Sequence, residues 1–195
     1  MRVEAQENLA LEVHQRNGGA FERLVEQFEA RLFNYAERIL QNRFDAQEVV
    51  QDTFLRAHDA LTRQYDAARA GELTLKPWLF RITRNLCFNK QRGKKSKLND
   101  PLSTFDDGRM GPLVPASTVS GPVEEKQERA ALERALELLP PESRELIVLR
   151  FMEEMSYAEI SKTTGLEESA LRGRVFRSLK LLRDALSISE VSHAM

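Results

Sequence analysis

Basic side chains gather in two segments of this sequence, and the last of them lies near the C-terminus. In residues 166–186, LEESALRGRVFRSLKLLRDAL, apolar residues recur at three- and four-residue steps (171, 175, 179, 182 and 186), which predicts the buried stripe of a helix. Guanidinium and ammonium groups bind phosphate oxygens and guanine edges, so the opposite face could contact DNA, or it could simply be solvated. The candidate contacts on and beside that face are Ser169, Arg172, Gly173, Arg174, Arg177 and Lys180.

The residues before this basic helix favour DNA over solvent. Ser156 and Glu159 have the spacing of a capping box and predict the start of a short helix. Gly165 suits the left-handed position that follows the end of a helix. A short helix, a glycine turn and a longer basic helix form the pattern of a helix-turn-helix, whose second helix enters the major groove. We therefore predict that this segment recognises DNA.

The second basic segment covers residues 76–97, KPWLFRITRNLCFNKQRGKKSK. It holds eight basic residues and no acidic one, and its amides could reach base edges. Trp78 is predicted to be a core residue rather than a platform for a base. Two basic helices in separate parts of one chain suggest two contacts on one DNA. The candidate contacts in this segment are Lys76, Arg81, Arg84, Asn85, Asn89 and Arg92.

An acidic stretch contrasts with these two segments. Residues 45–54, DAQEVVQDTF, carry three acidic residues and no basic one, and Glu48 and Asp52 share a helix face. Their spacing is compatible with a solvated surface or with a docking surface for a basic protein. Nothing in the chain has the pattern of an enzyme: there is no Gly-rich phosphate loop, metal-spaced His/Cys set or nucleophile–His pair. We predict no catalysis, no metal and no cofactor.

Composition fits a globular protein whose DNA contacts depend on segregated charge. Of the 195 residues, 42% are hydrophobic and 30% charged, and the formal net charge is −1. Cys87 is the only cysteine, which excludes an internal disulfide and indicates a reducing compartment. No apolar run approaches the length of a membrane span, so we expect a cytoplasmic protein without membrane insertion.

The elements that must position these side chains are all helices, so the predicted fold class is all-α. Apolar residues from Phe21 to Ile39 mark one helix, Asp45 is expected to cap a second, and a third should begin near Leu75 or Pro77. The stretch from 93 to 122 is rich in Gly and Pro and without helical or strand period, which predicts a flexible linker. The predicted plan is two small helical domains (5–92 and 123–187), a linker (93–122) and a tail (188–195).

In this order and with these gaps, the segments resemble an extracytoplasmic-function (ECF) sigma factor, the minimal two-domain class of the sigma-70 family. The match covers about residues 19–186. Its most discriminating parts are WL-x-x-I-x-x-N, from Trp78 to Asn85, and LPPESRE before the helix-turn-helix. The other segments that carry it are AFERLVEQFEARLFNYAERIL, DAQEVVQDTFLRAH and SYAEISKTTGLEESALRGRVFRSLKLLRDAL.

The resemblance implies roles for both domains. Residues 5–92 would be sigma region 2, whose acidic helix binds the β′ clamp helices of core RNA polymerase. The loop at 65–76 and the basic helix after it would read and melt the −10 element around a flipped base. Residues 123–187 would be region 4, which reads the −35 element beside the β flap. The polymerase contacts that the resemblance implies are Glu48, Gln51, Asp52, Phe54 and Arg56.

Two further expectations complete this interpretation. Members of this family are usually held inactive by an anti-sigma factor, so the resemblance implies such a partner. Gly173 stands where the family commonly has serine, which suggests a different −35 preference. The alternative from the residues alone is a free-standing helix-turn-helix repressor or activator that binds duplex DNA.

Overall fold

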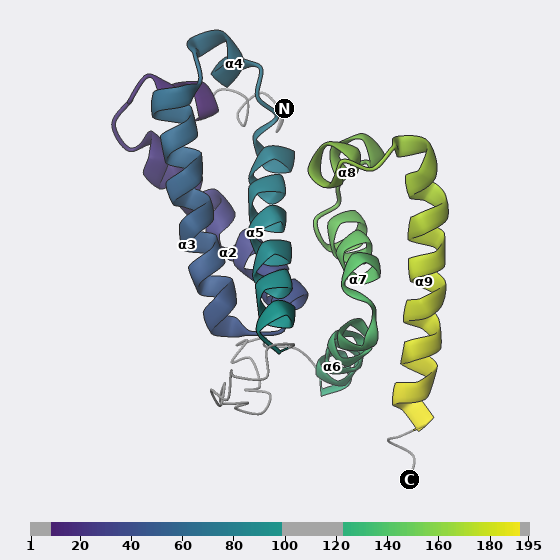
Figure 1. The fold of residues 1–195 in the computed structure, drawn as a ribbon. Coiled ribbons are helices and arrows are strands. Elements are labelled where there is room, and N and C mark those ends of the chain that lie inside the picture. The colour runs from purple at the N-terminus through teal and green to yellow at the C-terminus, as the bar shows by residue number, and fades with distance from the viewer. Residues whose placement is uncertain (1–8, 99–122, 192–195) are drawn as a thin grey trace.

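A computed structural model describes residues 9–98 and 123–191, with side chains at 9–93 and 129–186. These residues are helical and contain no strand, which confirms the all-α prediction. In the first half, a helix at 9–14 precedes α2 (Ala20–Leu40), α3 (Arg43–Asp59), a π-helical turn η1 (Ala60–Gln64), α4 (Ala67–Gly71) and α5 (Leu75–Leu98). The second half comprises α6 (Val123–Leu138), α7 (Pro141–Ile147), a π-helical turn η2 (Val148–Met152), α8 (Tyr157–Thr164) and α9 (Glu168–Val191) (Figure 1).

The ends of the helices follow local capping chemistry. The capping box of α8 is confirmed: the Ser156 hydroxyl accepts from the Glu159 amide, and the Glu159 carboxylate accepts from the Ser156 amide at 2.8 Å. Gly165 ends this helix at φ 75°, as predicted. The prediction that Asp45 caps α3 is wrong, because Asn42 takes that place and accepts from the Asp45 amide at 3.0 Å.

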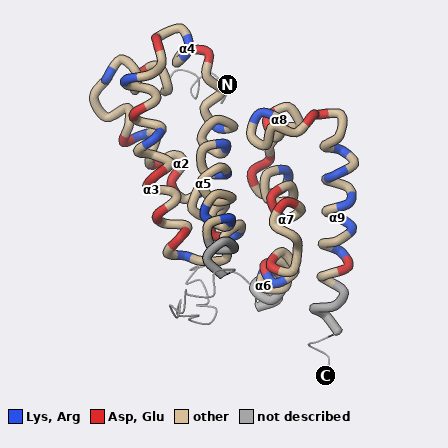
Figure 2. Tube along the Cα trace, in the orientation of Figure 1, with Lys and Arg blue, Asp and Glu red and all other residues tan. Residues whose placement is uncertain are grey.

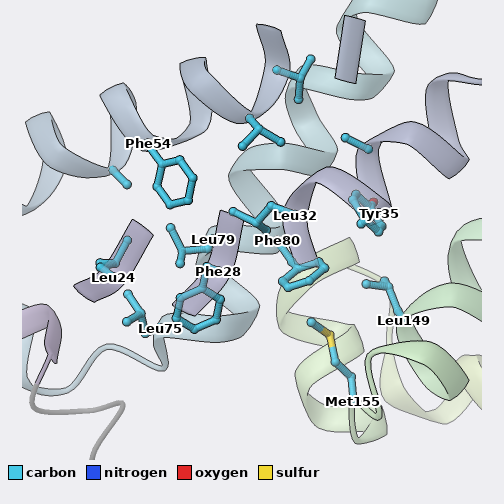
Figure 3. Close-up of a cluster of buried hydrophobic side chains, with 14 of the residues drawn as sticks. Leu24, Phe28, Leu32, Tyr35, Phe54, Leu75, Leu79, Phe80, Leu149 and Met155 are labelled. Carbon is cyan, nitrogen blue, oxygen red and sulfur yellow. The ribbon is translucent and has the colours of Figure 1, made fainter. Parts of the chain in front are cut away.

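Large apolar side chains of α2 and α5 form the core of the first half. Phe28 and Tyr35 of α2 are fully buried, as is Phe80 of α5. The rings of Tyr35 and Phe80 meet edge to face, with centroids 5.3 Å apart (Figure 3). This packing fixes the direction of α5, the helix that carries the predicted −10 contacts.

The two halves are packed together through one continuous apolar cluster. Leu149 and Met155 of the second half are buried beside Phe80 (Figure 3), and α5 lies against α8 while α2 touches α7. The predicted linker begins later than expected, because α5 continues to Leu98. The rest of that linker, residues 99–122, lies outside the described residues, as do 1–8 and 192–195.

The core encloses the only cysteine. Cys87 is buried, and this burial raises the pKa of its thiol to about 12. At about pH 8 only about one thiol in ten thousand would then be the reactive thiolate. We expect iodoacetamide to leave the folded protein unmodified and to label one thiol per chain in guanidinium chloride. Rapid labelling of the folded protein, followed by intact-mass spectrometry, would contradict a buried position.

Candidate functional site

The basic helix α9 lies on the side of the second half that faces away from α5, and blue segments run along it (Figure 2). The buried stripe of α9 differs from the predicted one. Leu171, Val175 and Leu182 are buried, but Leu179 is 37% exposed and Ser178 takes its place at 2%. The helix therefore packs with a shorter period than the one predicted. The six candidate contacts are all exposed: Ser169, Arg172, Gly173, Arg174, Arg177 and Lys180.

Aromatic and glycine residues shape the basic surface formed by these six residues. The guanidinium of Arg172 lies over the ring of Tyr157, the first residue of α8, at 5.4 Å from its centroid. Arg150 lies 5.3 Å from the same ring. A β-carbon on Gly173 would meet only the Arg177 side chain, at 3.7 Å, so the fold does not require glycine there. Because Gly173 has no side chain, the surface is recessed between Arg172 and Arg174.

A cleft of about 500 Å³ opens between α3, η1 and α5. Trp78, predicted to be a core residue, is half-buried in the wall of this cleft and packs against the core cluster. Its indole N–H donates to the Tyr65 hydroxyl at 3.1 Å. The guanidinium of Arg69 lies 3.9 Å from the centroid of the Tyr65 ring. Aromatic walls and an amide are the groups that bind an unstacked base. The other residues that line the cleft include Leu55, Arg56, Gln64, Ile82 and Asn85.

The six candidate contacts of α5 divide into two groups. Four of them are exposed: Arg81, Asn85, Asn89 and Arg92. The other two already have partners in the second half. Arg84 donates to the Glu145 carboxylate at 2.7 Å, and the Lys76 ammonium donates to the backbone carbonyl of Glu153. These two cations are therefore engaged within the chain in this arrangement.

The acidic face of α3 is accessible, with one exception among its predicted contacts. Glu48, Gln51 and Arg56 are exposed and Asp52 is half-buried. Phe54, predicted to bind polymerase, is instead a core residue, because its position on α3 turns the ring toward Phe21. The centroids of these two rings are 6.4 Å apart.

Two exposed apolar residues on this face were not among the predicted contacts. Phe44 is 71% exposed and Leu55 is 61% exposed. Their eleven-residue separation returns to nearly the same angle on a helix of 3.6 residues per turn, so they lie on one face. That spacing was readable in the sequence. The Lys90 ammonium contacts Glu48 at 2.6 Å and thereby joins this face to α5.

Within the parts of the chain that the structure describes, no cluster of His, Cys, Asp and Glu could hold a metal ion. No helix in these same ranges has both the length and the apolar character needed to cross a bilayer.

The sequence matches two regions of one protein family. Sigma-70 region 2 matches residues 24–97, and Sigma-70, region 4 matches residues 129–182. The chain is 32% identical over 183 residues to the ECF RNA polymerase sigma factor SigE of Mycolicibacterium smegmatis, covering 86% of this chain and 62% of that protein. It is 27% identical over 138 residues to SigM of Bacillus subtilis, covering 71% of this chain and 77% of that protein. The chain thus spans about three fifths of the length of SigE.

Solved structures share the fold. CnrH, in complex with the cytosolic domain of CnrY, matches with a TM-score of 0.68 and 26% identity, over 95% of this chain and 99% of CnrH. The sigma factor RpoE of Bartonella quintana, in complex with the anti-sigma factor NepR, matches with a TM-score of 0.68 and 22% identity, over 87% of this chain and 98% of RpoE. With region 2 and region 4 both matched in order, the chain belongs to the sigma-70 family, in its ECF group.

Proposed function

We propose that this protein is an alternative sigma factor, which binds core RNA polymerase, directs it to specific promoters and opens the −10 region. The observation that carries the proposal is the pairing of a basic recognition helix in region 4 with an aromatic cleft beside the basic helix of region 2. Such a protein catalyses no reaction itself, since the polymerase forms the phosphodiester bonds. Its place of action would be the cytoplasm, where the polymerase works.

The polymerase would dock on α3. Glu48, Gln51, Asp52 and Arg56 offer polar contacts to the β′ clamp helices. The exposed Leu55 and Phe44 add apolar area that a protein partner would bury. A mixed polar and apolar face of this kind suits a protein interface better than a purely solvated one.

The promoter would be held at two places. The arginines of α9 would contact the −35 element, with region 4 beside the β flap, and Tyr157 would orient Arg172 toward the groove. The cleft beside Tyr65 and Trp78 would hold the flipped base of the −10 element, with Asn85 at its edge. The exposed Arg81, Asn89 and Arg92 of α5 would hold the neighbouring backbone.

An anti-sigma factor would control this activity. The proposal rests on the family resemblance, and RpoE of Bartonella quintana is an example of a sigma factor solved with such a partner. Co-purification from the native host should yield a protein that blocks transcription when it is added to the complete polymerase.

Permanganate reactivity of −10 thymines tests the role of the cleft. Asn85→Ala removes the amide at the edge of the cleft, and we expect about tenfold slower appearance of reactive thymines with core polymerase and promoter DNA. Asn34→Ala, an exposed amide on α2, is the matched control and should behave as the native protein does. Equal rates for both variants would contradict the cleft as the base site. Absence of reactive thymines with the native chain would contradict the proposed function itself.

A further inference from the structure

Two arginines of the second half lie against one tyrosine ring. Arg150 belongs to η2 and Arg172 to α9, and their guanidinium carbons lie 5.3 and 5.4 Å from the centroid of the Tyr157 ring. Tyr157 is the first residue of α8, so three successive elements each contribute one of these side chains. The face of an aromatic ring is a favourable position for a guanidinium, and one ring here holds two of them.

No carboxylate balances these two charges among the residues that the structure describes, because neither Arg150 nor Arg172 forms an ion pair there. Other exposed arginines do have acidic partners, as Arg63 has Asp59 at 3.2 Å. Glu159, the acidic residue in the first turn of α8, is already engaged in the capping box of that helix. Two neighbouring cations without a counter-charge repel each other and attract an external anion.

The turn between η2 and α8 positions the donors of this cluster. Glu154 has a left-handed φ of 53°, and the Arg150 Nη1 donates across this turn to the Met155 carbonyl at 3.0 Å. That bond uses one N–H group of a guanidinium that has several, and the others remain for a ligand. Within the described residues the Tyr157 hydroxyl has no hydrogen-bond partner. The cluster therefore offers N–H and O–H donors from three side chains.

The cluster lies where a helix-turn-helix meets the sugar–phosphate backbone. In this motif the second helix enters the major groove and the first helix crosses the backbone. Tyr157 begins the first helix, α8, and Arg172 is exposed on the second helix, α9. Phosphodiester oxygens only accept hydrogen bonds, whereas base edges in the major groove present donors as well as acceptors. A positively charged cluster of donors therefore suits the backbone better than a base.

We propose that Arg150, Tyr157 and Arg172 form a phosphate clamp, which binds the DNA backbone beside the −35 element and reads no base. This proposal rests on the proposed function, in which α9 occupies the major groove. Both guanidiniums and the Tyr157 hydroxyl donate to phosphate oxygens, and the Tyr157 ring is the positioning group for the two arginines. Backbone contacts of this kind fix the register of a recognition helix on the duplex. The clamp therefore leaves the base edges to Arg174 and Arg177.

Fluorescence anisotropy with the full chain and two labelled duplexes of unrelated sequence, each of about 20 base pairs, tests the clamp. Arg150→Gln should raise the Kd about fivefold on both duplexes, because a phosphate contact does not depend on sequence. The slope of log Kd against log salt concentration should fall by about one. Tyr157→Leu removes the ring that positions both arginines and should also raise the Kd about fivefold, whereas Tyr157→Phe keeps the ring and should cost less than about threefold.

The matched control makes the same charge change outside the cluster. Arg134→Gln alters an exposed arginine of α6, and it should change the Kd less than about twofold and keep the native salt slope. Arg150→Lys keeps the charge but loses the planar fork, so its salt slope should equal that of the native chain while its Kd rises. This variant separates a lost phosphate contact from a disturbed turn, because a disturbed turn would affect the glutamine and lysine variants alike.

Three results would overturn the inference: an unchanged salt slope in Arg150→Gln, equal losses in the Arg150→Gln and Arg134→Gln variants, or a loss confined to one of the two duplexes, which would indicate base reading. A native chain that binds neither duplex at low salt would overturn it as well. None of these measurements involves polymerase. A chain whose clamp behaves as expected, but which directs no initiation by core polymerase, would contradict the proposed function and leave the clamp supported.

Discussion

Reversing the charge of the acidic face of α3 is expected to abolish stable association with core RNA polymerase. Glu48→Lys with Asp52→Lys places two cations where the proposed β′ interface needs acids. Like charges at a protein interface cost several kcal/mol, so we expect at least about a 100-fold rise in the Kd, or about 3 kcal/mol. Binding should be measured without DNA, by interferometry with immobilised core polymerase, so that promoter contacts do not contribute.

The control for this variant changes the same charges on another helix. Glu26→Lys with Glu29→Lys alters two exposed carboxylates of α2, and we expect its Kd to stay within about threefold of the native value. Circular dichroism should show the same helix content for both variants. Equal binding by the two would mean that α3 is not the polymerase-binding helix.

Replacing Arg144 is expected to cause the largest loss of stability among single substitutions at polar residues. Its side chain is 3% exposed and donates to the carbonyls of Leu136, Leu139 and Arg38 at 2.7, 2.9 and 2.7 Å. These carbonyls lie at the C-terminal ends of α6 and α2, where the helix dipoles favour a cation. Burial lowers the pKa of this guanidinium from its ordinary value. Arg144→Ala leaves buried carbonyls without a donor, so we expect the free energy of unfolding to fall by about 3 kcal/mol.

Urea denaturation followed by circular dichroism measures this loss. Arg134→Ala removes an exposed arginine of α6 and should change the free energy of unfolding by less than about 0.5 kcal/mol. Trp78, the only tryptophan, reports separately on the first half by fluorescence. A similar midpoint for the Arg144 and Arg134 variants would contradict the structural role of Arg144.

Features set by neighbouring residues were predictable from the sequence. The box of Ser156 and Glu159 and the turn at Gly165 depend on a few consecutive positions, and both were found where they were predicted. The cap of α3 was misassigned because Asn42 and Asp45 are both good capping residues and only the path of the chain chooses between them. The prediction of the buried stripe of α9 was wrong by one residue. Packing of α9 against α6 and α7 buries Ser178 and leaves Leu179 partly exposed.

Features that join distant parts of the chain were not predictable in the same way. Arg84 and Glu145 are 61 positions apart, and each has an ordinary place on the polar side of its own helix pattern. Their pairing depends on how the two halves pack against each other. The hydrophobic period of a single helix contains no information about that packing. For the same reason the sequence did not reveal the second-half partners of Lys76 and Arg84, two residues predicted to contact DNA. The exposed side chains of Phe44 and Leu55 could have been found from their spacing.

Run-off transcription with purified core polymerase tests the central claim most directly. Core polymerase alone and core polymerase with this chain would be given fragments of the native genome, and the 5′ ends of the transcripts would be mapped. We predict that the chain produces discrete start sites whose upstream sequences align into one −35 and one −10 element. Transcripts that start at the same positions with and without the chain would contradict its function as a sigma factor.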